Sequence, residues 1–444
     1  MFGGICMNFV KFIFFNIYTY IISIIITLIN IPILQFFHIK NIVFGIVLYY
    51  VCLQLFIHIY EGYKLGRYKV SEIVYSVSIS VLICNVMMYF VVYLVTGHWF
   101  VLLIALLLQC LHTLLIIIWA VRGNIYYFKL YEHHKILLVY GSDPTLVAKK
   151  IEARKNRYFI AKTMSDKEDL ETIKKELDHY KSIMVYDVKN EVKDMISIYC
   201  FEKGKSFFII PDIAEIIRRG TRNLYLMDTP LMMTNHWGLT PGQCVIKRIM
   251  DLVIIIPVAI IASPFMLITA MCIKLYDGGP VIYKQKRLTQ AGKIFEVYKF
   301  RSMIVDAEKH GAQLSTTKDS RITPVGKVIR AIRFDELPQI INILKGEMSN
   351  VGPRPERPEI AEEYYKDFPE FKLRLRVKAG LTGYAQVFGK YNTTPEDKLK
   401  LDLMYINDYS IFLNLKLIIY TVKILFMKDS TEGIEEGKTT AGKK

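Results

Sequence analysis

The stretch LVIIIPVAIIASPFMLITAMCI, residues 252–273, decides how the chain is arranged, because it combines the length of a membrane span with two internal prolines. About 20 apolar residues let a helix cross the hydrocarbon layer. Pro257 and Pro264 each remove a backbone donor and bend a helix, and Ser263 can help to satisfy the carbonyls that Pro264 frees. The pattern predicts a re-entrant helix that breaks at Ser263-Pro264 and returns to the same membrane face.

The charges that flank this stretch favour the same interpretation. A helix that crosses a membrane leaves one side poor in positive charge. Here both sides are basic, with Lys247 and Arg248 before the stretch and Lys274, Lys284, Lys286 and Arg287 after it. A kinked helix that crosses the membrane is the alternative, and it would place the following domain outside the cell.

Four more apolar runs precede this stretch, near residues 12–37, 41–60, 73–96 and 98–121. Each is long enough to cross a bilayer, so residues 1–124 are predicted to form a four-helix transmembrane bundle. The loop 61–72 carries Lys64, Arg67 and Lys69, whereas the turn 96–98 has no Lys or Arg. Because positive residues remain in the cytoplasm, both ends of the bundle are expected there. A lone His112 in the last run is interpreted as a packed helix residue rather than a proton relay.

Residues 134–235 have a different pattern, in which short apolar strands alternate with charged helical segments. The expected strands are residues 135–141, 158–164, 182–187 and 206–211. This alternation predicts a parallel, Rossmann-like α/β domain. The first strand ends in Gly141-Ser142-Asp143-Pro144 rather than in GxGxxG, so we expect a degenerate domain without a working nucleotide site.

Composition restricts the partners of the chain. Its 444 residues exceed what one core usually organises, and 52% of them are hydrophobic. A net charge of +16 suits an anionic partner such as nucleic acid, a phospholipid surface or a phosphorylated substrate. The seven cysteines have no close spacing, so neither a disulfide framework nor a zinc site is predicted.

The chemistry is concentrated around RFDELPQ, residues 333–339, where Asp335 and Glu336 are adjacent in a basic segment. Asp335 as the N-cap of a following helix is the structural alternative. The same geometry would place a carboxylate beside Arg330, Arg333 and a helix N-terminus, where phosphate binds. There one carboxylate can attack phosphorus while the other holds a divalent metal such as Mg²⁺. A basic cluster that only holds anionic membrane lipid remains the competing interpretation.

Two later segments support a phosphate site to different degrees. Gly352 and two prolines around Arg354 predict a stiff loop that fixes one guanidinium, although a rigid surface turn would have the same sequence. The glycine loop 378–383 is too short a pattern to specify phosphate binding.

Residues 412–426 are amphipathic and are expected to lie in the membrane interface. The tail, residues 428–444, is predicted to be disordered.

Together these segments resemble the bacterial sugar transferase family, the polyisoprenyl-phosphate hexose-1-phosphate transferases. The resemblance is carried by an ordered set of motifs over residues 245–427. The set is Ser263-Pro264, Gly279-Pro280-Val281, Gln285 with Arg287, Lys299-Phe300-Arg301-Ser302-Met303, Asp306-Ala307-Glu308, Asp335-Glu336-Leu337-Pro338-Gln339, Val351-Gly352-Pro353-Arg354-Pro355-Glu356 and Gly380-Leu381-Thr382-Gly383. Phe334 departs from the leucine or isoleucine that is commoner before the acidic pair, which we expect to affect packing more than chemistry.

The resemblance implies a membrane protein of α plus α/β class, with a re-entrant helix and a small cytosolic α/β catalytic domain. Such enzymes transfer a sugar 1-phosphate from a UDP-sugar to undecaprenyl phosphate on the cytoplasmic leaflet of the inner membrane, and release UMP. This step starts exopolysaccharide, capsule or O-antigen synthesis and involves no nucleic acid.

The roles implied for the site are as follows. Asp335 becomes phosphoglycosylated and Glu336 coordinates Mg²⁺. The basic side chains expected to bind substrate phosphates are Arg330, Arg333, Arg354, Lys299 and Arg301.

The sequence leaves other questions open. A membrane scaffold without turnover and a glycosyltransferase that releases UDP are the competing functions. No residue discriminates among glucose, galactose and N-acetylated aminosugars. A homodimer through the bundle or the α/β domain is compatible with the sequence.

Overall fold

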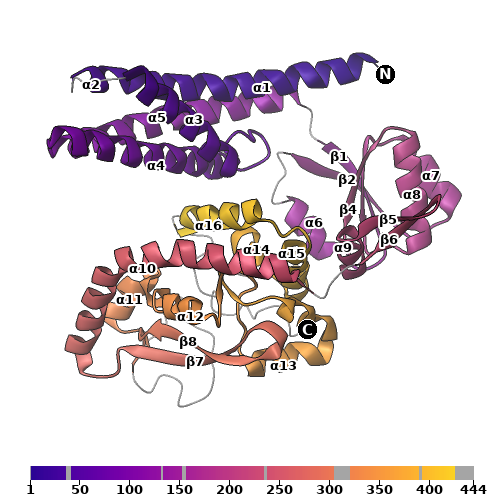
Figure 1. Cartoon of the computed structure of the whole chain (residues 1–444). Helices are drawn as coiled ribbons and strands as arrows, with labels where there is room; N and C mark the ends of the chain where they lie inside the picture. The colour runs from indigo at the N-terminus through magenta and orange to yellow at the C-terminus, as the bar shows by residue number, and fades with distance from the viewer. Residues whose placement is uncertain are drawn as a thin grey trace. The chain divides into compact units, whose positions relative to one another are not determined.

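The computed structural model describes residues 2–36, 42–131, 134–152, 157–234, 238–304, 321–389 and 393–425. The chain divides into two compact units, residues 1–211 and residues 212–444 (Figure 1). The predicted disordered tail lies outside the described residues.

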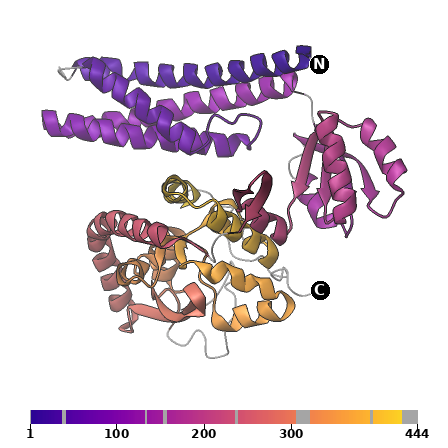
Figure 2. The same cartoon turned by 45° about the vertical axis from the view of Figure 1, so that its right-hand side comes forward.

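Long helices make up the first part of unit 1. They are α1 (Phe2–Ile29), α2 (Ile31–Phe36), α3 (Ile42–Ile59), α4 (Val70–Thr96) and α5 (Phe100–Leu130). α1, α3, α4 and α5 share one apolar core, and Figures 1 and 2 show them packed side by side. Three of the predicted runs therefore correspond to one helix each, and the first run, near residues 12–37, covers most of α1 and all of α2. Within these helices, residues 16–36, 42–59, 70–96 and 103–130 are long enough and apolar enough to cross a membrane.

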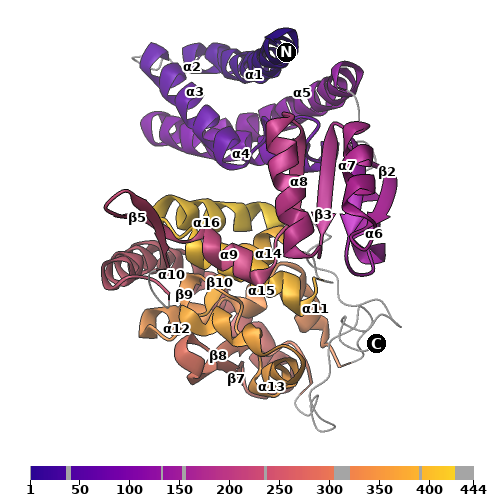
Figure 3. The same ribbon diagram turned by 90° about the vertical axis from the view of Figure 1, so that its right-hand side faces the viewer.

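The remainder of unit 1 is a four-stranded parallel sheet. Its elements are β1 (His134–Tyr140), α6 (Thr145–Glu152), β2 (Tyr158–Ser165), α7 (Leu170–Asp178), β3 (Ser182–Tyr186), α8 (Asn190–Glu202) and β4 (Ser206–Ile210). Leu137, Val139 and Ile183 share a core with apolar residues of α7 and α8, and Figure 3 shows α8 lying along β3. The predicted strands are confirmed to within a residue or two at each end.

The strand order adds one detail to the Rossmann-like prediction. The order is β2-β1-β3-β4, which is the flavodoxin-like arrangement of a doubly wound sheet rather than the 3-2-1-4 order. At the carboxyl ends of β1 and β3, a Cβ on Gly141 would lie only 2.1 Å from the carbonyl oxygen of Asp187 and 3.1 Å from Oδ2 of buried Asp166. A phosphate is disfavoured beside Gly141, because a carbonyl and a carboxylate oxygen lie close to it.

Unit 2 begins with α9 (Ile213–Arg219) and a hairpin of β5 (Arg222–Leu226) and β6 (Thr229–Met233). The sequence grouped these residues with the α/β domain that ended at residue 235. In the structure α9 packs against α15 (Pro395–Asn407): Ile216 joins the core around Leu403, and Asn407 donates a hydrogen bond of 2.6 Å to the Ile216 carbonyl. Such a long-range contact leaves no local signal in the sequence.

The rest of unit 2 is built from short elements around α10 (Pro241–Asp277). These are β7 (Ile282–Leu288), the 3-10 turn η1 (Gln290–Gly292), β8 (Ile294–Phe300), α11 (Pro324–Ala331), the 3-10 turn η2 (Phe334–Glu336), α12 (Gln339–Lys345), β9 (Ser349–Val351), α13 (Pro358–Asp367), the 3-10 segment η3 (Pro369–Arg376), β10 (Gly380–Thr382), α14 (Tyr384–Phe388), α15 and α16 (Ile411–Leu425). β7 and β8 form an antiparallel hairpin, whereas β9 and β10 are parallel.

α10 contains the stretch that opened the sequence analysis. Thr240 caps its start by accepting a hydrogen bond from the Gln243 amide, and Gly278 ends it with a left-handed backbone, φ 68°. The helix bends along its course (Figure 1), and Ser263 Oγ donates a hydrogen bond of 2.8 Å to the Ile260 carbonyl beside Pro264. Only 11% of its most apolar window is buried, so most of its apolar side chains face no other part of the protein.

Candidate active site

The acidic pair lies in the short turn η2 between α11 and α12. α11 ends at Ala331, and Arg333 then adopts a left-handed conformation with φ 55°. For a residue other than glycine this conformation costs roughly 1–2 kcal/mol, and such strain occurs most often at functional sites. Asp335 does not cap a helix, because α12 begins only at Gln339 and its N-cap position is Pro338. The structural alternative of helix capping is therefore wrong, and the acidic pair is held by a strained turn.

Glu336 is fixed by two cations from different segments. Lys299 Nζ, at the end of β8, lies 2.9 Å from Glu336 Oε1, and Arg354 Nη2 lies 2.8 Å from the same oxygen. The Glu336 side chain is only 14% exposed. Burial alone would raise its pKa, but Arg354 and Lys299 hold the pKa of Glu336 well below its usual range. Glu336 is therefore an ionised anchor.

The pKa of its neighbour Asp335 is displaced in the opposite direction. Burial raises the pKa of Asp335, and the charge of Glu336 adds to the rise, while Lys299, Arg330 and Arg354 oppose it. Two adjacent carboxylates whose surroundings displace their pKa values in opposite directions are a recurrent sign of divided catalytic roles. Of the two, Asp335 is the more basic carboxylate.

The loop that carries Arg354 is held by close backbone packing. Gly352 N donates a hydrogen bond of 2.8 Å to the Thr382 carbonyl, and Gly380 N donates one of 3.0 Å to the Pro353 carbonyl. A Cβ on Gly352 would lie 2.3 Å from the Lys378 carbonyl oxygen, and one on Gly380 would lie 2.0 Å from the Gly352 nitrogen. The two glycine motifs of the sequence therefore pack against each other and fix the Arg354 loop.

A buried ionic cluster also holds the Arg354 loop, and sequence reasoning missed this cluster. Arg374 Nη2 donates a hydrogen bond of 3.0 Å to the Arg354 carbonyl and lies 2.8 Å from Asp402 Oδ2. Arg374 Nη1 reaches Glu356 Oε1 at 3.3 Å, and Arg287 Nη1 donates to the Pro355 carbonyl at 3.0 Å. These partners are far apart in the sequence, so only the fold reveals them.

Two other predicted phosphate ligands, Arg301 and Arg330, also have protein partners. Arg301 forms an ion pair with Asp277, the last residue of α10, and is only 8% exposed. Arg301 therefore holds the end of α10 in this arrangement. Arg330 Nε donates a hydrogen bond of 2.8 Å to Ser302 Oγ, which orients this guanidinium within electrostatic range of Asp335.

Both halves of α10 are attached to the site. In the first half, Asp251 Oδ2 accepts a hydrogen bond of 2.7 Å from Ser349 Oγ at the start of β9. After the proline break, the Phe265 ring meets the Phe334 ring edge to face, with centroids 6.2 Å apart. Phe334 immediately precedes Asp335, so the residue that departs from the family pattern packs against α10.

The acidic pair fits a Mg²⁺ ion in a limited way. Among the residues that the structure describes, no three His, Cys, Asp or Glu side chains form a metal-binding group. Mg²⁺ in phosphate chemistry needs only one or two protein carboxylates, because substrate phosphates and water supply the other ligands. Cations contact Glu336 Oε1, which leaves Oε2 as the oxygen that would hold the ion.

Comparison with known proteins places this site in a family. The profile described as "Bacterial sugar transferase" matches residues 242–428. A UDP-N-acetylgalactosamine-undecaprenyl-phosphate N-acetylgalactosaminephosphotransferase of Aeromonas hydrophila is 40% identical over 189 residues, which are 42% of this chain and 45% of that protein. A UDP-glucose:undecaprenyl-phosphate glucose-1-phosphate transferase of Escherichia coli is 37% identical over 222 residues, 49% of this chain and 48% of that protein.

A shorter relative delimits the shared part. The uncharacterized sugar transferase EpsL of Bacillus subtilis is 37% identical over 193 residues, which are 43% of this chain but 91% of that protein. The chain spans about half the length of the first two relatives. The fold and the site thus define a protein that has long apolar helices and a compact domain with two adjacent carboxylates. This chain belongs to the bacterial sugar transferase family, which confirms the predicted resemblance.

Proposed function

We propose that this protein transfers a sugar 1-phosphate from a UDP-sugar to undecaprenyl phosphate and releases UMP, as the first membrane step of surface polysaccharide synthesis. The observation that carries the proposal is the adjacent pair Asp335 and Glu336 within the family-matched region, where Lys299 and Arg354 lie 2.9 and 2.8 Å from Glu336 Oε1. The activities for which two relatives are named support the acceptor and the reaction type. Their sugars differ, so the proposal extends only to the class of UDP-hexoses.

The reaction divides into two steps at Asp335. An oxygen of ionised Asp335 attacks the β-phosphorus of the UDP-sugar; an oxygen–phosphorus bond forms, the bridge between the two phosphorus atoms breaks, and its oxygen leaves with UMP. An oxygen of undecaprenyl phosphate then attacks the same phosphorus and frees the carboxylate. The chain contributes the raised basicity of Asp335, the anchor Glu336, and the guanidinium of Arg354 beside the transferred phosphate.

A Mg²⁺ ion held by Glu336 Oε2 would neutralise phosphate charge when bound. Lys299 and Arg354 would keep Glu336 ionised and correctly aimed for this purpose. Arg330, which Ser302 orients, would contact the donor phosphates; it precedes Asp335 in the chain, whereas Arg354 follows it.

The membrane arrangement is part of the proposal. α1, α3, α4 and α5 would cross the bilayer, and α10 would enter the cytoplasmic leaflet of the inner membrane, break at Ser263-Pro264 and return. The attachment of both halves of α10 to one small domain supports a re-entrant helix, since a straight helix of 37 residues would be about 55 Å long and would separate its ends across the bilayer. The site would then lie at the cytosolic surface, where a lipid phosphate can reach it.

The decisive experiment follows the nucleotide product and the enzyme adduct. The full chain in bilayer nanodiscs is incubated with Mg²⁺ and a panel of UDP-sugars, and products are separated by chromatography. We expect UMP, and mass spectrometry of the enzyme incubated with donor alone should find a hexose phosphate on Asp335. Release of UDP instead would identify a conventional glycosyltransferase.

Two variants make the test specific. Asp335→Ala should abolish both UMP release and the adduct. Asp367→Asn, an exposed acid on α13, is the matched control and should retain both. UMP release that persists in Asp335→Ala would rule out the assignment of the nucleophile.

A further inference from the structure

A cavity with several polar lining residues lies beside the first turns of α10, and the proposed reaction does not use it. Its volume is about 100 Å³, whereas roughly 10–15 Å³ on this measure suffices for one water molecule. Hydrophobic side chains complete its wall, but its polar lining consists of Cys244, Lys247, Arg248, Asp251, Gln290 and Lys378. We call this space the Lys247 cavity.

The charges around the Lys247 cavity are unbalanced. Lys247 is only 5% exposed, and its ammonium donates a hydrogen bond of 2.8 Å to the Val351 carbonyl. Among the described residues no carboxylate forms an ion pair with Lys247, Arg248 or Lys378. The one carboxylate of the lining, Asp251, already accepts hydrogen bonds from Ser349 Oγ and the Asn350 amide. The charge of Asp251 acts on Lys247 without a direct ion pair, and a buried ammonium in this position is costly unless an anion completes the site.

Helix capping explains part of this arrangement but not all of it. Arg248 Nη1 and Nη2 donate to the Ile343 and Leu344 carbonyls at 2.6 and 2.8 Å, and Lys378 Nζ donates to the Gly346 carbonyl at 2.8 Å. Cations are favourable at the C-terminal end of a helix such as α12. These contacts use two of the five N–H groups of arginine and one of the three of lysine. They give no reason for Lys247.

Two of the three cations, Arg248 and Lys378, lie close together beside Gly346. A Cβ on Gly346 would lie 3.5 Å from the guanidinium carbon of Arg248 and 3.7 Å from Lys378 Nζ. Two like charges held over one glycine repel each other, and an anion between them would reverse the sign of that interaction. An oxyanion with several acceptor oxygens matches the unused donors of all three side chains.

The surroundings of the cavity indicate where the anion comes from. Val245, Ile246 and Ile249, on the same turns of α10, are 60%, 46% and 58% exposed. A cationic cavity beside exposed aliphatic side chains complements a molecule whose phosphate adjoins hydrocarbon. We propose that the Lys247 cavity binds the phosphate group of an anionic glycerophospholipid. The phosphate chemistry rests on the cavity alone, whereas the lipid source also rests on the proposed insertion of α10.

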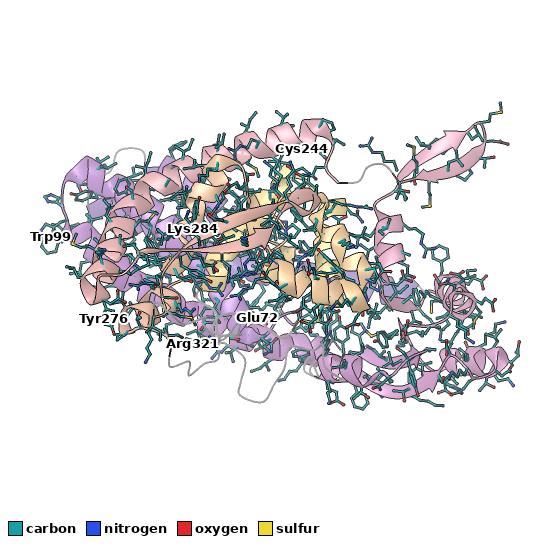
Figure 4. The ribbon with its side chains drawn as sticks, turned by 90° about the horizontal axis from the view of Figure 1, so that it is seen from below. Glu72, Trp99, Cys244, Tyr276, Lys284 and Arg321 are labelled. Carbon is teal, nitrogen blue, oxygen red and sulfur yellow. The ribbon has the colours of Figure 1, made fainter. Side chains whose placement is uncertain are left out.

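Cys244 provides a reporter for the test, because it lines the cavity and its side chain is exposed (Figure 4). The full chain is reconstituted in nanodiscs of phosphatidylcholine, alone or mixed with phosphatidylglycerol. Alkylation of Cys244 by N-ethylmaleimide is followed by peptide-resolved mass spectrometry, and its rate is compared between the two lipid compositions. We expect phosphatidylglycerol to slow the modification of Cys244 several-fold relative to phosphatidylcholine alone.

Variants separate the cavity from general surface charge. Lys378→Gln removes one cavity cation, whereas Lys284→Gln removes an exposed charge from β7, away from Cys244 in Figure 4. Protection should remain in Lys284→Gln and be lost in Lys378→Gln, and melting temperatures show that both variants fold. Equal protection in the two variants would overturn the proposal.

A soluble arm identifies the source of the phosphate. The same alkylation is measured in neutral detergent with inorganic phosphate. Protection by inorganic phosphate without protection by phosphatidylglycerol would overturn the lipid source, and absence of protection in both would overturn the anion site. Because thiol alkylation is the readout, a chain that shows lipid protection but releases no UMP would refute the proposed function and leave this proposal intact.

Discussion

Asp335 and Glu336 are neighbours in the chain, but the cations around them and the effect of burial differ. Lys299 and Arg354 contact Glu336 directly, whereas burial dominates at Asp335. A substitution at either position therefore removes a different function. The pair has to be tested through properties that separate a nucleophile from an anchor.

The first such property is the acid limb of the pH profile. The pKa of Asp335 is raised from an ordinary value of 3.8, so its unreactive protonated form accumulates at a higher pH than for an exposed aspartate. We expect UMP release to decline on acidification at a pH above the usual aspartate range, in rates measured from about pH 4 to 8. Lys299→Ala removes a cation that lowers this pKa, so the limb should move further up. A limb at the ordinary position that Lys299→Ala does not move would contradict this assignment.

Arg374 allows a prediction about stability. Its side chain is 3% exposed, and its removal leaves Asp402 and Glu356 as buried charges with one cation fewer. Arg374→Gln should lower the free energy of unfolding by about 3–5 kcal/mol, the usual cost of breaking a buried ion pair from one side. Denaturant unfolding of the detergent-purified protein measures the loss.

Lys398 offers the matched control for Arg374. It lies 3.8 Å from the same carboxylate oxygen of Glu356, but its side chain is 30% exposed. Lys398→Gln should cost less than about 1 kcal/mol, because water screens the pair. Similar small losses in both variants would show that the cluster does not stabilise the Arg354 loop.

At the scale of elements, the proline break in α10 is the critical feature. Pro264→Leu restores a backbone donor and lets the helix straighten, which would separate Phe265 from Phe334 and Asp277 from Arg301. We expect UMP release to fall at least about tenfold, since a displacement near 1 Å at a catalytic turn can cost 10²-fold. The measurement is the rate in nanodiscs, together with the labelling of a cysteine placed at Ile304 from either side of the membrane. Pro257→Leu, outside the Ser263-Pro264 break, is the comparison; full activity and unchanged labelling in Pro264→Leu would show that the break is dispensable.

Sequence patterns predicted elements well because their signals are local. The four strands of the α/β domain are short apolar runs bounded by turn residues, and they appear as β1 to β4. Strand order depends on pairing between distant segments, so the flavodoxin-like order was not predicted. The start of α12 was misplaced because the left-handed turn at Arg333, which delays the helix, has no glycine to indicate it.

The candidate site shows the same division between local and long-range information. Motif residues such as Lys299, Glu336 and Arg354 were predicted and do meet. The partners of Arg301 and of Arg374 were not predicted, because ion pairs between distant residues leave no spacing in the sequence. The roles of the site residues in the reaction stay predictions until the variants are measured.

At the scale of the whole molecule, the chain consists of two compact units, and one of them contains every candidate site residue. EpsL of Bacillus subtilis, of which 91% aligns with this chain, has little beyond the corresponding part. We therefore expect residues 212–444 alone, expressed in membranes, to retain UMP release. Circular dichroism and the product assay on the purified fragment test this; a folded fragment without activity would show that the first unit contributes to the reaction.

The contact between Phe265 and Phe334 joins the bend of α10 to the residue before Asp335. Bilayers are elastic, and their thickness changes with acyl chain length, temperature and composition at a cost of fractions of a kcal/mol per Å of mismatch. In the proposed arrangement the bend of α10 lies inside the bilayer. A change in bilayer thickness would therefore displace the bend and, through Phe334, the carboxylate of Asp335. Under the proposed function, turnover would then follow acyl chain length at constant headgroup chemistry, so that the rate of sugar transfer would depend on bilayer thickness.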